Sequence, residues 1–298
     1  MAKRRKKTSP MKSIITTLLI LLVAGGFMIF KGSTPEFLRQ YIPPELQAIF
    51  YPTPTGTGGG SIAINNLPAT DGNTSITSFS TAKTQLKKLY VQAGSFTTFY
   101  CGSSFDEEFN LDHSQSGFHY RMNETRANRV EWEHIVPAEA FGQSFAEWRD
   151  GHPDCLDSKG EPYAGRRCAS KTSPQFKLMQ ADMYNLVPAI GEVNGDRSNY
   201  SYAMLQGELR EYGQCNMEIE DQKAEPPDDK FGDIARTYMY MESAYHRGVI
   251  SGKNVKLFEA WNRMDPVDRW ECERARLIEQ IQGNRNMIVA QACQEAGL

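Results

Sequence analysis

A carboxylate and an imidazole stand side by side at Glu133 and His134, within the segment 131–138 (EWEHIVPA). A later segment, 182–189 (DMYNLVPA), supplies an amide oxygen at Asn185. Carboxylate and amide oxygens are the ligands that Mg²⁺ prefers, and Mg²⁺ keeps several of its waters. A neutral imidazole beside such a cation can take the proton from an attacking water. These residues predict a hydrolytic site with one hard cation, in which Glu133 and Asn185 bind the metal and His134 is the general base.

The elements that carry these residues restrict the geometry. Neighbouring residues on a strand point to opposite faces, so Glu133 and His134 can serve one site only where their strand ends or bends. Residues 130–136 alternate as a strand does, and Pro137 follows directly. Hydrophobic periodicity predicts a further strand, a polar loop at 150–167 and several helices. The further strand is expected at 96–101, and the helices at 81–90, 139–148, 174–185, 234–246, 254–264 and 266–282.

The Glu–His pair has a second interpretation in which it does no chemistry. By spacing alone such a pair is common, and most examples are structural or lie on the surface. An anchored binding module of the cell envelope with a structural pair would show no metal-dependent cleavage. Loss of Glu133 or Asn185 would then have little effect, and this contrast separates the two hypotheses.

Longer motifs favour the catalytic interpretation. The segments 131–138, 182–189 and 191–199 (GEVNGDRSN), in this order, resemble the endonuclease I family of bacterial periplasmic and secreted nucleases. The resemblance spans roughly residue 80 to the C-terminus. It implies an α+β fold with a ββα-metal core, additional helices and disulfide bonds. It also implies Mg²⁺ or another divalent cation as cofactor. The implied activity is cleavage of DNA with little sequence preference, and RNA is an alternative substrate.

The resemblance also assigns roles to individual residues. Glu133 and Asn185 match the metal ligands, His134 matches the general base, and Arg166 matches an arginine that holds the scissile phosphate. Arg167 is adjacent to Arg166 and is a second candidate for contact with nucleic acid. Arg197, with Asn194 and Asn199, offers further phosphate contacts, although such a run is also typical of a turn whose side chains bond to the backbone.

The charge distribution limits how nucleic acid can bind. The formal net charge of the 298-residue chain is −3, and six of the 33 basic residues precede the first apolar run. The remaining 27 basic residues stand against 36 acidic ones. A body this acidic does not coat a polyanion through its overall charge, so phosphate contact requires a local basic patch.

The N-terminal 30 residues predict a signal-anchor. A basic cluster at 3–7 precedes 17 uncharged residues at 14–30, which as a helix would rise roughly 25 Å, just short of a typical hydrocarbon core. Positive charge before the run keeps the N-terminus in the cytoplasm. We expect a monomer on the periplasmic face of the inner membrane, or a secreted or periplasmic protein if the segment is a cleaved signal peptide. Residues 31–80 are expected as a flexible linker and 81–298 as the endonuclease domain.

The cysteine content agrees with a location outside the cytoplasm. Six cysteines lie after residue 100, and no C-x-x-C pair occurs. This pattern favours three disulfides over a zinc site, against the alternative of six reduced thiols in a cytosolic protein. Fifteen pairings are possible, so the connectivity stays open. In one possible set, a Cys155–Cys168 disulfide would close a short loop and a Cys272–Cys293 disulfide would tie two C-terminal helices. This would leave Cys101 to pair with Cys215.

Overall fold

The computed structural model describes residues 63–207 and 209–298. The predicted anchor at 14–30 and most of the predicted linker lie outside these residues. Within the described part of the chain, the structure contains no helix whose length and hydropathy would suit a membrane span.

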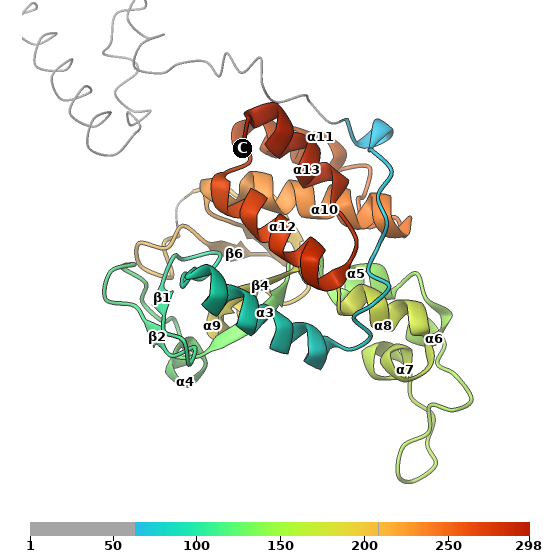
Figure 1. Cartoon of the computed structure of the whole chain (residues 1–298). Coiled ribbons are helices and arrows are strands. Elements are labelled where there is room, and N and C mark those ends of the chain that lie inside the picture. The colour runs from blue at the N-terminus through green and yellow to red at the C-terminus, as the bar shows by residue number, and fades with distance from the viewer. Residues whose placement is uncertain (1–62, 208) are drawn as a thin grey trace, which may run out of the picture. The chain divides into compact units, whose positions relative to one another are not determined.

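The described chain combines many helices with three small sheets (Figure 1). The elements are η2 Ile64–Asn66, α3 Phe79–Ala93, β1 Ser104–Phe105, β2 Leu111–Asp112, α4 Glu124–Ala127, β3 Val130–His134, α5 Ala138–Gly142, α6 Ala146–Arg149, α7 Gly165–Thr172, α8 Pro174–Gln180, η3 Met183–Asn185, β4 Leu186–Ile190, α9 Gly191–Arg197, β5 Ser201–Tyr202, β6 Glu218–Glu220, β7 Lys223–Glu225, η4 Asp228–Lys230, α10 Phe231–Tyr245, α11 Val255–Met264, α12 Arg269–Gln282 and α13 Met287–Ala296.

Two antiparallel strands and the helix that follows them form the centre of the fold. β3 and β4 pair in register from Val130 opposite Ile190 to His134 opposite Leu186. All five residues of β4 are buried, and α9 begins immediately after the strand. The backbone N–H of Gly191, its first residue, donates to the carbonyl of Arg129 at 3.0 Å. β3, β4 and α9 therefore form a ββα unit, and the predicted α+β class is confirmed.

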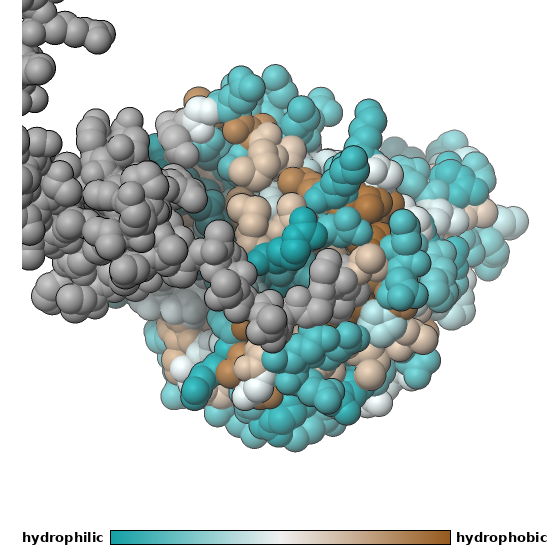
Figure 2. All heavy atoms as spheres, turned by 90° about the horizontal axis from the view of Figure 1, so that it is seen from above, coloured by the Kyte–Doolittle hydropathy of each residue, from teal (hydrophilic) through white to brown (hydrophobic). Residues whose placement is uncertain are grey.

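A layer of C-terminal helices packs beside this unit (Figure 1). α10 is its centre, because most of the helix is buried, including two tyrosines and two methionines. Phe231 of α10 stacks on Trp261 of α11, with ring centroids 4.4 Å apart. Arg236 of α10 forms two hydrogen bonds with Glu271 of α12, at 2.7 and 2.5 Å. These contacts join the helices into one layer. In the view of Figure 2, the outer surface of this layer is mainly hydrophilic, with smaller apolar areas among the hydrophilic residues.

The folded unit begins before the predicted boundary at residue 81. Asn73 and Ile76 are buried, with 1% and 7% of their surface exposed. The backbone N–H of Asn73 donates to the hydroxyl of Tyr245 at 2.8 Å, which fixes this part of the chain to α10. Ser75 donates to the carbonyl of Gln282 at 2.5 Å. Residues assigned from sequence to the end of the linker thus pack against α10 and α12.

Some predicted elements differ from the observed ones. The strand at 96–101 is wrong: Thr97 makes one isolated bridge to Ser104, and the chain turns through Gly102, whose φ of 63° is left-handed. The helix at 139–148 is two helices, α5 and α6, because Phe145 between them has an extended backbone, with φ −100° and ψ 134°. The long helix at 174–185 ends at Gln180, and α7 begins within the predicted loop.

The structure forms three disulfides, which settle the connectivity that the sequence leaves open: Cys101–Cys215, Cys155–Cys168 and Cys272–Cys293. Cys155–Cys168 ties the loop 150–164, which projects beside α6 and α7 (Figure 1), to α7. Cys272–Cys293 joins α12 to α13. Every cysteine of the chain lies in a disulfide, so the alternative of six reduced thiols finds no support.

Candidate active site

A cavity of about 600 Å³ opens around the end of β3. Residues from seven elements line it (α3, α4, β3, α5, α6, α7 and α9), and five of their side chains bear on the predicted reaction. They are Lys83 of α3, Glu133 and His134 of β3, Arg166 of α7 and Asn194 of α9. The cavity therefore brings together four of the site residues predicted from sequence, Glu133, His134, Arg166 and Arg197.

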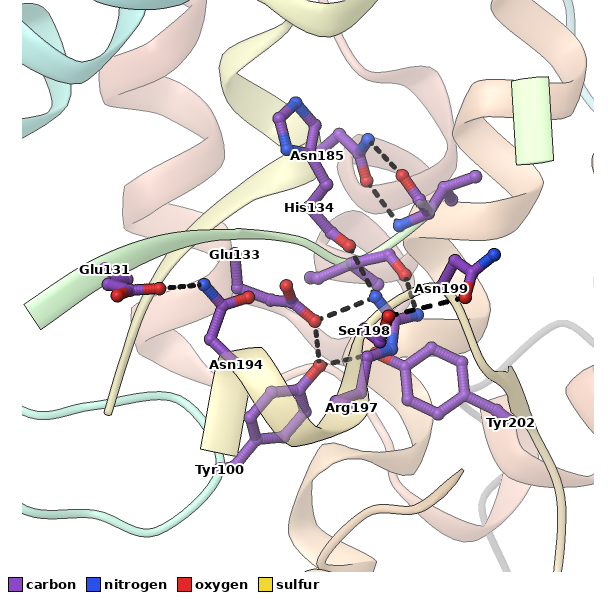
Figure 3. A network of polar contacts seen from close by, with 12 residues as sticks. Tyr100, Glu131, Glu133, His134, Asn185, Asn194, Arg197, Ser198, Asn199 and Tyr202 are labelled. Carbon is purple, nitrogen blue, oxygen red and sulfur yellow. Dashed lines mark hydrogen bonds and ion pairs between the residues drawn. The ribbon is translucent and has the colours of Figure 1, made fainter. Parts of the chain in front are cut away.

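The protein holds Glu133 by hydrogen bonds to one of its two carboxylate oxygens. Its side chain is almost fully buried, and Oε1 accepts hydrogen bonds from the hydroxyl of Tyr100 at 2.7 Å and from Nη1 of Arg197 at 2.8 Å. Burial raises the pKa of the Glu133 carboxyl, and the charge of Arg197 opposes this shift. In Figure 3 the other oxygen of Glu133 makes no hydrogen bond to the residues drawn. One carboxylate oxygen is thus committed to the protein, and the second can face a cation.

His134 has a defined tautomer. Its Nε2 lies 2.8 Å from the carbonyl oxygen of Gln180, which can only accept, so Nε2 carries the proton and Nδ1 has the free electron pair. Burial and, to a smaller extent, the positive charge of Arg166 together lower the pKa of His134 to about 3. The ring packs on Phe79, with centroids 4.9 Å apart. A neutral, oriented imidazole of this kind is suited to accept a proton.

The two adjacent arginines at the start of α7 are placed differently. Arg166 lines the cavity, and its guanidinium lies over the ring of Phe79, 5.5 Å from the centroid. Arg167 lies over the ring of Tyr163 at 4.0 Å and does not line the cavity. The rings of Phe79 and His134 and the guanidinium of Arg166 therefore lie together at one end of the cavity.

Asn185 does not lie where the sequence prediction needs it. The residue is fully buried just before β4. Its Oδ1 accepts from the backbone N–H of Val136 at 2.7 Å, and its Nδ2 donates to the carbonyl of Val136 at 2.9 Å. Both ends of the amide are used to hold the chain beyond β3, and Asn185 does not line the cavity. The structure thus contradicts its role as a metal ligand.

Asn194 of α9 offers the amide that Asn185 does not. Its Nδ2 donates to Oε2 of Glu131 at 2.7 Å, so Oδ1 is turned away from Glu131. Figure 3 shows this oxygen directed toward the carboxylate of Glu133. The run 191–199 contains Asn194, but from sequence alone this run is equally typical of a turn or of phosphate contacts. The helix that follows β4 is what brings Asn194 to the cavity.

Arg197 is not available to nucleic acid. None of its surface is exposed, and its guanidinium donates to Glu133, to the carbonyl of His134 at 2.9 Å and to the carbonyl of Ile135 at 2.7 Å. It also lies over the ring of Tyr202, 4.5 Å from the centroid. The expected phosphate contact is therefore wrong. Arg197 holds the end of β3 and neutralises Glu133 (Figure 3).

The donor set suits a hard cation that needs few protein ligands. Among the described residues, no three His, Cys, Asp or Glu side chains gather as a metal cluster. Glu133 and Asn194 present one carboxylate oxygen and one amide oxygen to the same space, which fits a cation that keeps several waters. The absence of soft ligands at the cavity fits oxygen-preferring metals better than zinc.

The strand pair, its helix and this acid–base arrangement define a ββα nuclease fold. Comparison with known proteins gives the family: the Endonuclease I family model matches residues 69–293, and the chain belongs to the endonuclease I family. The chain is 40% identical over 222 residues to an extracellular deoxyribonuclease of Aeromonas hydrophila, covering 72% of this chain and 90% of the relative. A periplasmic deoxyribonuclease of the same organism is 40% identical over 72% of this chain and 86% of its own.

A third relative comes from another organism. Endonuclease-1 of Buchnera aphidicola subsp. Acyrthosiphon pisum is 40% identical over 202 residues, which are 66% of this chain and 74% of that protein. The family membership supports the nuclease interpretation of the Glu–His pair. It gives no support to the alternative of a binding module without catalysis.

Proposed function

We propose that this protein is a divalent-metal-dependent endonuclease that hydrolyses phosphodiester bonds of DNA with little sequence preference. The observation that carries the proposal is the neutral His134, whose free Nδ1 shares one cavity with Glu133, Asn194 and Arg166. The deoxyribonuclease names of the A. hydrophila relatives support DNA as the substrate. RNA is the alternative substrate, because the reacting group is a phosphodiester in both polymers.

Each residue has one task in the proposed reaction. Glu133 and Asn194 hold the divalent cation, for which Mg²⁺ is our first choice. When bound, the cation would stabilise negative charge on the phosphate and on the leaving oxygen. Nδ1 of His134 takes the proton from the attacking water, while the Gln180 carbonyl keeps the ring in its orientation.

Arg166 serves the substrate in this scheme. Its guanidinium, placed on Phe79, donates charge-assisted hydrogen bonds to the scissile phosphate. Lys83 lines the same cavity, with its ammonium 4.9 Å from the Phe79 ring centroid, and we assign it a neighbouring phosphate. Contacts to phosphates carry no sequence information, which fits cleavage without sequence preference.

We further propose that the enzyme works outside the cytoplasm. Three disulfides require an oxidising compartment, and the printed names of the relatives are extracellular and periplasmic. The segment 14–30 lies outside the described residues. Its retention as an anchor on the inner membrane therefore stays a prediction from sequence, and mass spectrometry of the mature N-terminus would test it.

The test of the reaction is cleavage of supercoiled plasmid, and of a single-stranded RNA, by the full chain with its disulfides intact. We expect cleavage with Mg²⁺ and none with EDTA. His134→Ala should lower kcat by about 10²–10⁴-fold, the usual contribution of a positioned base. A folded His134→Ala enzyme that cuts plasmid at the wild-type rate would remove His134 from the mechanism.

Arg166 and Arg167 provide a matched pair in the same assay. Arg166→Ala should lower kcat, because the Arg166 guanidinium lies at the cavity. Arg167→Ala removes the same charge one residue later, outside the cavity. If Arg167 contacts the backbone of bound DNA, its loss raises KM and leaves kcat near the wild-type value.

A further inference from the structure

Glu131 collects hydrogen bonds at the edge of the cavity. Its Oε1 accepts from Nε of Arg126 at 2.9 Å and from Nε of Arg129 at 3.1 Å. Its Oε2 accepts from Nη2 of Arg126 at 2.7 Å and from Nδ2 of Asn194 at 2.7 Å. Two arginines therefore neutralise this carboxylate, and one amide uses it as an acceptor. None of the roles assigned above explains why such a group lies here.

The strand geometry gives Glu131 a relation to the metal-binding carboxylate. Glu131 and Glu133 are two residues apart on β3, so their side chains leave the same face of the strand. That face is turned toward α9, which carries Asn194 (Figure 3). Glu131 takes the Nδ2 side of the Asn194 amide, and the Oδ1 side is directed toward Glu133. The two carboxylates thus lie on opposite ends of one amide group.

Two glycines of α9 leave the space that this arrangement needs. A Cβ at Gly195 would lie 1.9 Å from Nη1 of Arg126, so any larger residue would displace the guanidinium. A Cβ at Gly191 would lie 2.5 Å from the carbonyl oxygen of Arg126 and 3.0 Å from Cδ of Glu131. Close approach of Arg126 and Glu131 to α9 therefore depends on both positions.

We propose that Glu131 is a positioning residue, which holds the Asn194 amide with its oxygen toward the divalent cation. The inference rests on the proposed function, because it takes Asn194 as a metal ligand. An Asn amide presents either a carbonyl oxygen or an NH₂ group, and only the oxygen can bind a cation. The carboxylate of Glu131 accepts and cannot donate, so it fixes which end is offered. Arg126 and Arg129 keep Glu131 occupied as an acceptor, which leaves cation binding to Glu133.

The test measures binding of Mn²⁺ alone to the full chain, by electron paramagnetic resonance of the free ion, without any substrate. Glu131→Ala should weaken Mn²⁺ binding by about 10–100-fold, the usual loss when the partner of a metal ligand is removed. Glu131→Gln keeps an acceptor oxygen and should recover part of that loss. Glu273→Ala is the matched control, since Glu273 also pairs with an arginine in two contacts, 2.9 and 2.6 Å long, but on α12.

A double-mutant cycle separates positioning from a simple charge effect. If Glu131 acts through Asn194, then Glu131→Ala should change Mn²⁺ affinity by less than about 3-fold once Asn194 is already alanine. If the charge of Glu131 attracts the cation directly, the loss stays the same in both backgrounds, and the proposal is overturned. Equal affinities of Glu131→Ala and wild type would overturn it as well.

A separate variant distinguishes failure of this inference from failure of the proposed function. Glu133→Gln should abolish Mn²⁺ binding if the cation site is correct. Loss in Glu133→Gln together with no loss in Glu131→Ala removes only the positioning role. Full Mn²⁺ binding by Glu133→Gln would instead remove the cation site itself, and with it both proposals.

Discussion

Replacement of Arg197 by methionine is the sharpest test of the buried network at the end of β3. The sequence predicted Arg197 as a contact for nucleic acid, whereas the structure buries it completely. Its guanidinium is the charged partner of Glu133, and it also donates to two backbone carbonyls, of His134 and Ile135. We therefore expect Arg197→Met to lower the free energy of unfolding as its direct effect, and to lower activity as a consequence.

The size of the effect follows from what the substitution leaves behind. Methionine fills much of the space but offers no donor, so the carboxylate of Glu133 stays buried without its partner. Breaking a buried pair from one side costs about 3–5 kcal/mol, a large part of the roughly 5–15 kcal/mol that stabilises a typical domain. Two unpaired carbonyls add to this cost. With a slope of about 2 kcal/mol per molar urea, the midpoint should fall by roughly 1.5–2.5 M.

Urea unfolding, followed by tryptophan fluorescence and circular dichroism at pH 7 with disulfides intact, measures this shift. The double variant Glu133→Gln with Arg197→Met removes the uncompensated charge, so we expect it to regain at least about 2 kcal/mol over Arg197→Met. An Arg197→Met protein with the wild-type midpoint but a raised KM for plasmid would refute the buried network. That result would restore the phosphate contact expected from sequence.

Three further outcomes are expected. The pKa of His134 is about 3 in the folded protein and about 6.5 in the unfolded chain. The stability from its neutral form is therefore complete above pH 6.5 and declines as the pH falls toward 3. Between pH 7 and pH 4.5 this loss is about 2.5 kcal/mol, and urea unfolding of His134→Gln should lack it; an equal loss in both proteins would contradict the shift. Lys83→Gln should lower the slope of log affinity for duplex DNA against log salt by about 1 in EDTA, whereas Lys88→Gln, on another side of α3, should leave it unchanged; equal slopes would exclude Lys83 as a phosphate contact. Removing the Cys155–Cys168 disulfide by a double serine substitution should cost about 3 kcal/mol in the same unfolding assay, given its sequence separation of 13 residues; no change would mean that the projecting loop unfolds independently.

The position of Glu133 and His134 at the end of a strand could be predicted from sequence, because local rules decide it. Alternation along 130–136 predicts the strand, and Pro137 predicts its end, so Glu133 and His134 had to lie at a strand terminus. The C-terminal helices were predicted for a similar reason, because α10, α11 and α12 repeat their apolar residues at helical spacing. α11 buries one side, with Phe258 and Trp261, whereas α10 is buried over most of its length.

The choice between Asn185 and Asn194 could not be made in this way. Each asparagine lies close to the buried strand β4, one just before it and one in the helix after it. Which amide meets Glu133 depends on the register of β4 against β3 and on the start of α9 at Gly191, both of which are tertiary facts. Arg197 was misassigned for the same reason. Its neighbours in sequence are polar, and only the fold turns its side chain inward.

The adjacency of Glu133 and His134 has a consequence for how the site is built. The strand pleat sends the two side chains to opposite faces, and in Figure 3 the imidazole points away from the carboxylate. Each face then meets its own support: Arg197 and Tyr100 hold Glu133, whereas the Gln180 carbonyl and an aromatic ring hold His134. Because β3 ends at His134, the cavity can extend around the strand terminus and include both residues. The cation and the base can therefore be held independently, and a substitution in one support should leave the other in place.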